Sequence, residues 1–230
     1  MIALLFFLLE HLVFGWCLRN RRGWGKALLR ALIAAGILFL SGTGKGIETI
    51  IWSFIFVFVT RLAIDSWLTE EGDPRQRIFW VLLGGSEMAH LWVTIFVLAA
   101  LTGEYRWGML LLAFEVKHWL ADWCLTNGTM AREKGRGIFN PWLVLHSSLH
   151  AIFSASLLGV FGAPMGVVVS LSIAEYLIHS VIDRSKGLIG QMAPITYDRA
   201  TFLGRLVFGG DQMLHHATYV VMAIVALKLA

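Results

Sequence analysis

The fold is decided by residues 146–183, which read HSSLHAIFSASLLGVFGAPMGVVVSLSIAEYLIHSVID. Two apolar runs, 142–162 and 165–184, overlap this stretch and are separated by the Gly162 to Pro164 segment, which is typical of a turn. A membrane-spanning helix needs about 20 mostly apolar residues, and each run has close to that length. The stretch therefore predicts two transmembrane helices joined by a short turn.

The composition of the whole chain is that of a membrane protein. Hydrophobic residues make up 57% of the 230 residues and charged residues only 15%, with a mean hydropathy of +0.71. Soluble domains carry roughly a quarter charged residues, so too little polar surface remains for a water-soluble fold. Cys17 and Cys124 form no CxxC pair, which argues against a disulfide or a thiolate metal site. No segment resembles a nucleic-acid-binding module, so the lipid bilayer is the expected partner.

Similar apolar runs predict an all-α, polytopic transmembrane helical bundle of about eight spans. The N-terminal run lacks a basic start and a small-residue cleavage site, so we interpret it as a retained helix and not a signal peptide. The predicted spans are 2–18, 27–41, 47–68, 77–102, 107–126, 142–162, 165–184 and 200–228.

Basic residues orient this bundle, because cytoplasmic loops are enriched in Lys and Arg. The odd-numbered connections carry Arg19, Arg21, Arg22, Lys26, Arg75, Arg77, Arg132, Lys134, Arg136, Arg184, Lys186 and Arg199. The even-numbered connections carry only Lys45 and Arg106. The pattern predicts a protein of the bacterial inner membrane with both termini on the periplasmic side, and it explains the net charge of +4 as a topology signal.

Three phrases recur in the same order in the two halves of the chain. LGGSEMAHLWVTIFVLAAL begins at Leu83 and FGGDQMLHHATYVVMAIVAL at Phe208; the other pairs are TRLAIDSW with IHSVIDRS, and HLVFGWCL with HWLADWCL. They predict two tandem four-helix repeats, with an N-terminal repeat over 1–103 and a C-terminal repeat over 104–230. Chance similarity between apolar strings is the alternative. The N-terminal copy is degenerate, since Arg61 stands where the other has His179, and Ser86 where it has Asp211.

Polar pairs at a spacing of four residues lie in the last four predicted spans. Residues four apart share one face of a helix, so each helix presents two potential metal ligands to one side. The loop charges also place all four pairs in the cytoplasmic half of the bilayer. The eight residues are His118, Asp122, His146, His150, His179, Asp183, Asp211 and His215.

These pairs predict a metal site. An ionisable side chain at bilayer depth costs about 2.5–3.5 kcal/mol on insertion scales, and a divalent cation compensates carboxylates and imidazoles together. Imidazole with carboxylate and without thiolate suits Zn²⁺ best, with Fe or Mn as alternatives. Asp122 and Asp183 could orient a ligating histidine instead of binding the ion. The alternative for each pair is a His–Asp hydrogen bond that joins two helices.

The C-terminal half also carries a longer motif, which combines the polar pairs with further residues in the loops and helices between them. Its positions are His118, Asp122, Met130, Ala131, Lys134, His146, Asp183, Lys186, Asp211, Gln212 and His215. On these residues the chain resembles a bacterial and phage membrane family catalogued as domain of unknown function 3307. The resemblance covers roughly residues 107–228 and implies no reaction, because the family has no established activity. A weaker similarity links the pattern to membrane-bound metal-dependent hydrolases.

We expect a metal-dependent hydrolase that acts on a phospholipid or lipid-linked ester at the cytoplasmic leaflet. His216 is a candidate acid/base, and Lys134, Arg184 and Lys186 are candidate contacts for an anionic headgroup. Core packing for His216 and membrane anchoring for the basic residues are the alternatives. Rival functions are a non-haem di-iron lipid oxidase, a divalent-metal or proton transporter, and an accessory subunit of a larger membrane complex.

Overall fold

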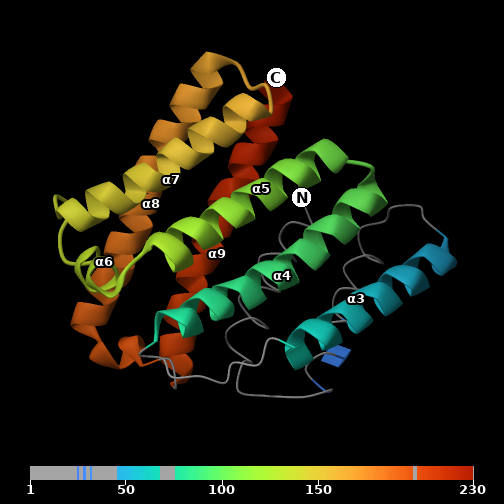
Figure 1. Ribbon diagram of the computed structural model, residues 1–230, viewed down its shortest axis with the longest axis horizontal. Coiled ribbons are helices and arrows are strands. Elements are labelled where there is room, and N and C mark those ends of the chain that lie inside the picture. The colour runs from blue at the N-terminus through green and yellow to red at the C-terminus, as the bar shows by residue number, and fades with distance from the viewer. Residues whose placement is uncertain are drawn as a thin grey trace. The chain divides into compact units, whose positions relative to one another are not determined.

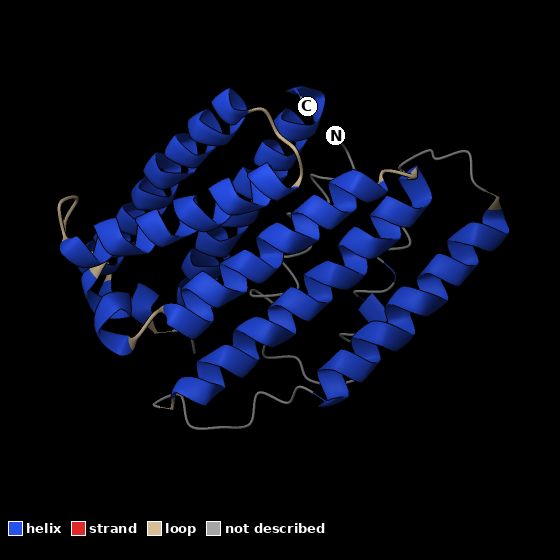
Figure 2. Ribbon diagram, turned by 45° about the horizontal axis from the view of Figure 1, so that its top comes forward, coloured by secondary structure: helices blue, strands red, loops and turns tan. Residues whose placement is uncertain are grey.

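The computed structural model describes residues 25, 28–29, 32, 46–67, 76–198 and 201–229, and within them it contains helices and short connections without a β-strand (Figure 1 and Figure 2). The all-α prediction is therefore confirmed for these residues. The predicted spans 2–18 and 27–41 lie almost entirely outside them. The chain divides into two compact units, Met1–Leu112 and Ala113–Ala230, which are described separately.

In the first unit, α3 (Ile47–Trp67) packs against α4 (Arg77–Thr102). Their contact includes a small apolar cluster of Val57, Val97, Leu98 and Leu101. Gly103 ends α4 with a φ of 77°, a left-handed conformation that favours glycine because it lacks a Cβ atom. The chain then reverses into α5 (Tyr105–Trp119), whose C-terminal residues belong to the second unit.

The second unit begins within α5, which widens at its C-terminal end into the π-helical turn η2 (Leu120–Leu125). The short α6 (Gly128–Glu133) follows, and then the long helices α7 (Pro141–Val160), α8 (Met165–Met192) and α9 (Phe202–Leu229), with the 3₁₀ turn η3 (Pro194–Tyr197) before α9. In this unit α7 packs on α8, and α8 packs on α9 (Figure 1). α6 and η2 both contact α7, and η3 contacts α8 and α9.

Local sequence signals set the boundaries of these helices. Asn127 and Asn140 are the N-caps of α6 and α7, and their side-chain oxygens accept the backbone N–H groups of Met130 and Trp142, each at 2.9 Å. Pro141 follows at the first helical position, where a missing N–H group is tolerated. α8 continues to Met192, past the predicted end at residue 184, and Pro194 follows two residues later, as is common after a helix end.

Five described helices are long and apolar enough to cross a membrane: α3, α4, α7, α8 and α9. The apolar side chains on α7 and α8 are exposed at many positions, including Ile152, Val160, Val169 and Val181. Their histidines and carboxylates are buried instead, which is the reverse of a water-soluble bundle. These features indicate an integral membrane protein. The eight spans and the tandem duplication stay predictions.

Candidate metal centre

The polar residues of the second unit form a column inside it, because each helix repeats them at intervals of about one turn. α7 carries a third buried polar residue one turn beyond its predicted pair, and so do α8 and α9. The column therefore has an outer, a middle and an inner level. From the outer to the inner level, the sets are His146, His150 and Ser154 on α7; Asp183, His179 and Glu175 on α8; and Asp211, His215 and Tyr219 on α9. Asp122 in η2 and His118 at the end of α5 belong to the outer and middle levels.

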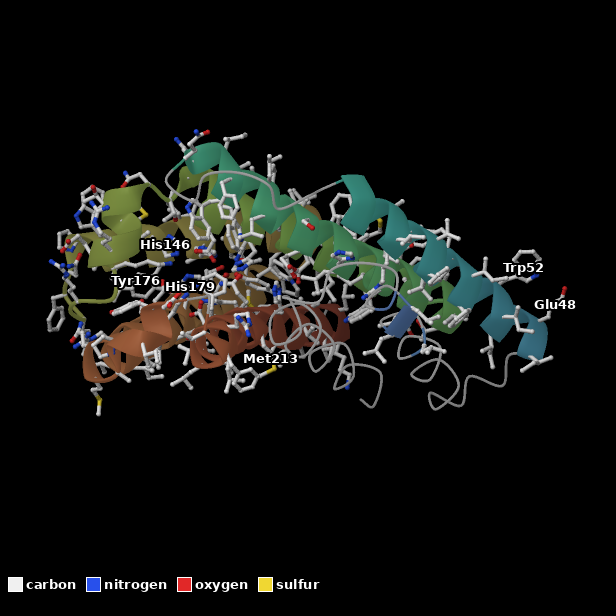
Figure 3. The ribbon with its side chains drawn as sticks, turned by 90° about the horizontal axis from the view of Figure 1, so that it is seen from below. Glu48, Trp52, His146, Tyr176, His179 and Met213 are labelled. Carbon is white, nitrogen blue, oxygen red and sulfur yellow. The ribbon has the colours of Figure 1, made fainter. Side chains whose placement is uncertain are left out.

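Two groups of potential ligand atoms lie in the outer and middle levels. The first contains one carboxylate and three imidazoles, from Asp122, His146, His150 and His179. The second contains His179, Asp183 and His215. Within each group the ligand atoms all lie within 4.8 Å of one another, close to the spacing of atoms around one bound ion. Figure 3 shows His146 next to His179, with their ring centroids 5.0 Å apart.

Hydrogen bonds turn a lone pair of His146 towards this cluster. The hydroxyl of Thr126 donates to the carbonyl oxygen of Ala121 at 2.8 Å, so its oxygen is left to accept the Nδ1–H group of His146 at 3.3 Å. The other nitrogen, Nε2, then carries the lone pair, and it lies 2.9 Å from Oδ1 of Asp122. Two acceptors at this distance need a cation or a proton between them.

A longer chain of hydrogen bonds orients His150 in the same way. The carboxylate of Asp211 can only accept, so the side-chain amide of Gln212 donates to it at 3.1 Å, and the amide oxygen accepts Nε2–H of His118 at 3.0 Å. Nδ1 of a neutral His118 then accepts the hydroxyl of Tyr219 at 3.1 Å, and the hydroxyl oxygen accepts Nδ1–H of His150 at 3.3 Å. The lone pair of His150 is therefore on Nε2, which belongs to the first ligand group.

Several buried atoms of the described cluster have no hydrogen-bond partner. They include Nε2 of His150, both ring nitrogens of His179 and Nε2 of His215. Oδ1 of Asp211 also has no hydrogen-bond partner. The corresponding oxygens of Asp122 and Asp183 have only ion-pair neighbours, Nδ1 of His118 at 3.2 Å and the ammonium of Lys134 at 3.0 Å. A buried polar group without a hydrogen bond costs about 1–3 kcal/mol. A divalent cation would satisfy imidazole nitrogens and carboxylate oxygens together, so the donor set fits a metal ion.

Lys134, which ends α6, reaches into the outer level of the cluster. Its ammonium lies 2.8 Å from Nε2 of His146, 3.0 Å from Asp183 and 3.3 Å from Asp122. Burial on its own lowers the pKa of Lys134, but the Asp183 and Asp122 carboxylates outweigh this effect and raise its pKa above the ordinary 10.5. Lys134 therefore brings a permanent positive charge to the place where a cation is needed.

The structure distributes the predicted site residues over several environments. Six predicted ligands belong to the two groups, whereas Asp211 pairs with Lys186, and His118 bonds to Tyr219 and Gln212. His216 is buried and 2.8 Å from Glu115. Arg184 donates to the backbone carbonyl of Gly135. The ligand roles of His118 and Asp211, the acid/base role of His216 and the substrate contacts stay predictions.

Sequence reasoning missed the inner level of the column. The ammonium of Lys117 pairs with Glu175, lies 3.1 Å from the hydroxyl of Ser154 and stands 4.1 Å from the ring centroid of Tyr219. All four residues are buried. A signal was present, because Ser154, Glu175 and Tyr219 continue the four-residue spacing of the predicted pairs by one more turn.

Comparison with known proteins finds one family. The family model described as "Protein of unknown function (DUF3307)" matches residues 109–230, which include all residues of the column. No curated protein and no solved structure shows significant similarity to the chain.

Proposed function

The chain belongs to the DUF3307 family, and we propose that it is a membrane-embedded, metal-dependent hydrolase of a lipid or lipid-linked ester at the cytoplasmic leaflet. The observation that carries the proposal is the pair of imidazoles, His146 and His150, whose Nε2 lone pairs face Asp122 in a buried cluster. Zn²⁺ is the ion we favour, with Fe or Mn as alternatives. A bound ion would supply polarisation of an ester oxygen and an activated water.

Residues of the chain hold the proposed ligands in position for this reaction. Thr126 and Tyr219 hold the two ligating rings, while Asp183 and His215 offer further ligand atoms next to them. In the hydrolysis, the oxygen of a water molecule bonds to the phosphorus or carbonyl carbon, the ester bond breaks, and a proton from the water ends on the leaving alcohol. An imidazole that is not bound to the ion can carry this proton, and His216 is the candidate.

Metal analysis of the purified protein tests the proposal. We expect stoichiometric divalent metal in the wild-type protein and its loss in His146→Ala, since that variant removes a ligand and leaves the helices intact. His90→Ala is the control, because His90 is a buried histidine of the first unit. Wild-type protein that binds no divalent metal under any growth supplement would refute the proposal. Iron together with an oxygen requirement would instead favour the lipid oxidase.

Transport is the second candidate, and the inner level of the column favours it. The pair between Lys117 and Glu175 lies one turn beyond His179 on α8, and Glu115 with His216 is a further buried pair. Ionisable residues inside membrane helices often mark ion or proton pathways. Proteoliposomes loaded with a pH indicator would separate the candidates, since a hydrolase predicts no metal-driven proton flux. A metal that only supports a larger membrane complex would give neither turnover nor flux.

The proposed arrangement in the membrane is eight spans in two tandem four-helix repeats, in the bacterial inner membrane, with both termini periplasmic. The basic residues Arg132, Lys134 and Arg136 support a cytoplasmic position for the connection between η2 and α7. Reporter fusions within this connection and at the C-terminus test the orientation. A cytoplasmic C-terminus would refute it.

A further inference from the structure

A cavity of about 490 Å³ opens beside the outer level of the column. This volume lies within the usual range of small-molecule sites, roughly 300–1,000 Å³. The cavity is built from the end of α6 and the connection after it, the C-terminal half of α8, and η3. Its lining includes Arg132, Lys134, Gly135, Arg136, Asp183 and Lys186.

Close backbone contacts hold the walls of this cavity together. A Cβ atom on Gly187 would lie 2.2 Å from the carbonyl oxygen of Gly135, so the connection after α6 touches α8 directly. A Cβ atom on Gly190 would lie 2.2 Å from the ring of Tyr197, which packs over that turn of α8. The side chain of Gln191 also donates to the Gly135 carbonyl, at 3.4 Å. The cavity is therefore fixed by small residues and is not an accidental gap.

The charges that line the cavity are mostly positive. Four basic side chains face one carboxylate, that of Asp183. Lys134 and Lys186 are held by the carboxylates of the column, and Arg136 pairs with Glu133 at 3.1 Å. Arg132 has no acidic partner in the described part of the chain and is exposed. An anion that enters the cavity would therefore meet an uncompensated guanidinium.

The cavity and the candidate metal centre share residues. Asp183 lines the cavity and belongs to the second ligand group, and Lys134 touches ligands of both groups. A ligand whose anionic group lies in the cavity would thus have its neighbouring atoms next to the candidate metal ligands. Met192 and Ile195 lie close in sequence to the lining residues Gln191 and Tyr197 and are 84% and 56% exposed.

We propose that this cavity binds the phosphate group of a phosphate ester, with Arg132 and Lys186 as its main contacts. The proposal deepens the proposed function, on which it rests, because it selects phosphate esters among the lipid and lipid-linked esters considered there. Guanidinium and ammonium groups are the usual partners of phosphate in proteins, and Arg binds it through two parallel hydrogen bonds. The phosphate could belong to a lipid headgroup or to a soluble ester.

Binding measurements on the full-length protein in phosphatidylcholine nanodiscs test this proposal. The probes are inorganic phosphate, glycerol 3-phosphate, and phosphatidate included in the nanodisc. Arg132→Gln should weaken binding about tenfold or more, since a hydrogen bond to a charged group is lost. Arg132→Lys should restore part of the affinity. Lys228→Gln, which removes an exposed charge at the far end of α9, should bind like the wild type.

The outcomes separate this proposal from the metal-dependent hydrolase. Tighter binding of phosphatidate than of glycerol 3-phosphate identifies a lipid headgroup, and equal binding identifies a soluble ester; both support the cavity. Unchanged affinity in Arg132→Gln, or an equal loss in Lys228→Gln, would overturn it. His146→Ala, which should lack metal, should still bind the phosphate probes. If no metal is found but phosphate binding depends on Arg132, the phosphate-binding proposal is supported and the metal-dependent hydrolase is refuted.

Discussion

Replacing Tyr219 by Phe tests whether the hydrogen-bond chain orients the candidate metal ligands. The Tyr219 hydroxyl is buried and joins Nδ1 of His118, at 3.1 Å, to Nδ1 of His150, at 3.3 Å. Phenylalanine removes only this hydroxyl. It keeps the ring, which is stacked on Phe114 with the centroids 5.6 Å apart and lies under the Lys117 ammonium at 4.1 Å.

The expected effect is weaker metal binding by about 10–100-fold, the usual result of removing a group that orients a ligating histidine. The structure supports this magnitude, because two hydrogen bonds of about 0.5–1.5 kcal/mol each are lost. Where the whole loss falls on the metal-bound state, their sum, about 1–3 kcal/mol, corresponds to roughly 5–150-fold in affinity. Without the hydroxyl, the hydrogen bond that keeps the proton on Nδ1 of His150 is lost, and Oε1 of Glu175 at 3.9 Å is too far away to replace it. The Nε2 lone pair of His150 is then less firmly fixed towards the cluster.

The measurement is a competition titration of Zn²⁺ between the purified protein and a chromophoric chelator. Tyr176→Phe is the matched control, since Tyr176 lies on α8 and its hydroxyl makes no hydrogen bond with a described cluster residue. Equal Zn²⁺ affinity in Tyr219→Phe and the wild type, with both proteins folded, would show that the chain does not orient the ligands. An equal loss in Tyr176→Phe would point to a general effect on folding.

Three further predictions concern the packing and charge of the same unit. Lys117→Met should lower the free energy of unfolding by about 3–5 kcal/mol, because Glu175 is left buried and unpaired. The double variant with Glu175→Leu should recover much of this stability. Detergent unfolding followed by circular dichroism measures the stability of both variants. Gly187→Ala should destabilise by about 1–3 kcal/mol, since its Cβ would lie 2.2 Å from a backbone oxygen, whereas Gly159→Ala, with open space around it, should not. Lys134→Met should tighten Zn²⁺ binding in the same chelator competition, because the ammonium occupies the lone pairs that the ion needs; weaker binding would mean that Lys134 supports the ion.

The all-α class and the long apolar helices could be predicted from the sequence, because apolar run length is a direct consequence of bilayer thickness, whereas the number of spans and the duplication stay predictions. The predicted span 142–162 corresponds to α7 (Pro141–Val160), and Asn140 with Pro141 marks its start. The π-helical turn at Leu120–Leu125 was not predicted. A widened turn depends on how the helix packs, and no residue type signals it. It matters here because Asp122 lies within it.

The candidate site was predicted in its outer and middle levels and missed in its inner level, for a physical reason. His146 with His150 stands out in an apolar helix, because two ionisable residues on one face must compensate each other. Ser154 and Tyr219 continue the four-residue spacing, but they are uncharged and need no compensation in a membrane helix, so the spacing alone does not mark them. Lys117 and Glu175 lie in different helices, so only the folded structure shows that they form a pair.

Charge balance inside the bilayer bears on how many ions the centre holds. The carboxylates of Asp122, Asp183 and Asp211 face the ammoniums of Lys134 and Lys186, which leaves one negative charge when the imidazoles are neutral. One divalent ion changes this to one positive charge, and two ions to three. Net charge at bilayer depth is unfavourable, so we expect one ion per chain without an anionic ligand. A phosphate ester in the adjacent cavity would offset further positive charge, so the metal content should rise only when the ester is present. Two ions per chain in the absence of any phosphate would contradict this reasoning.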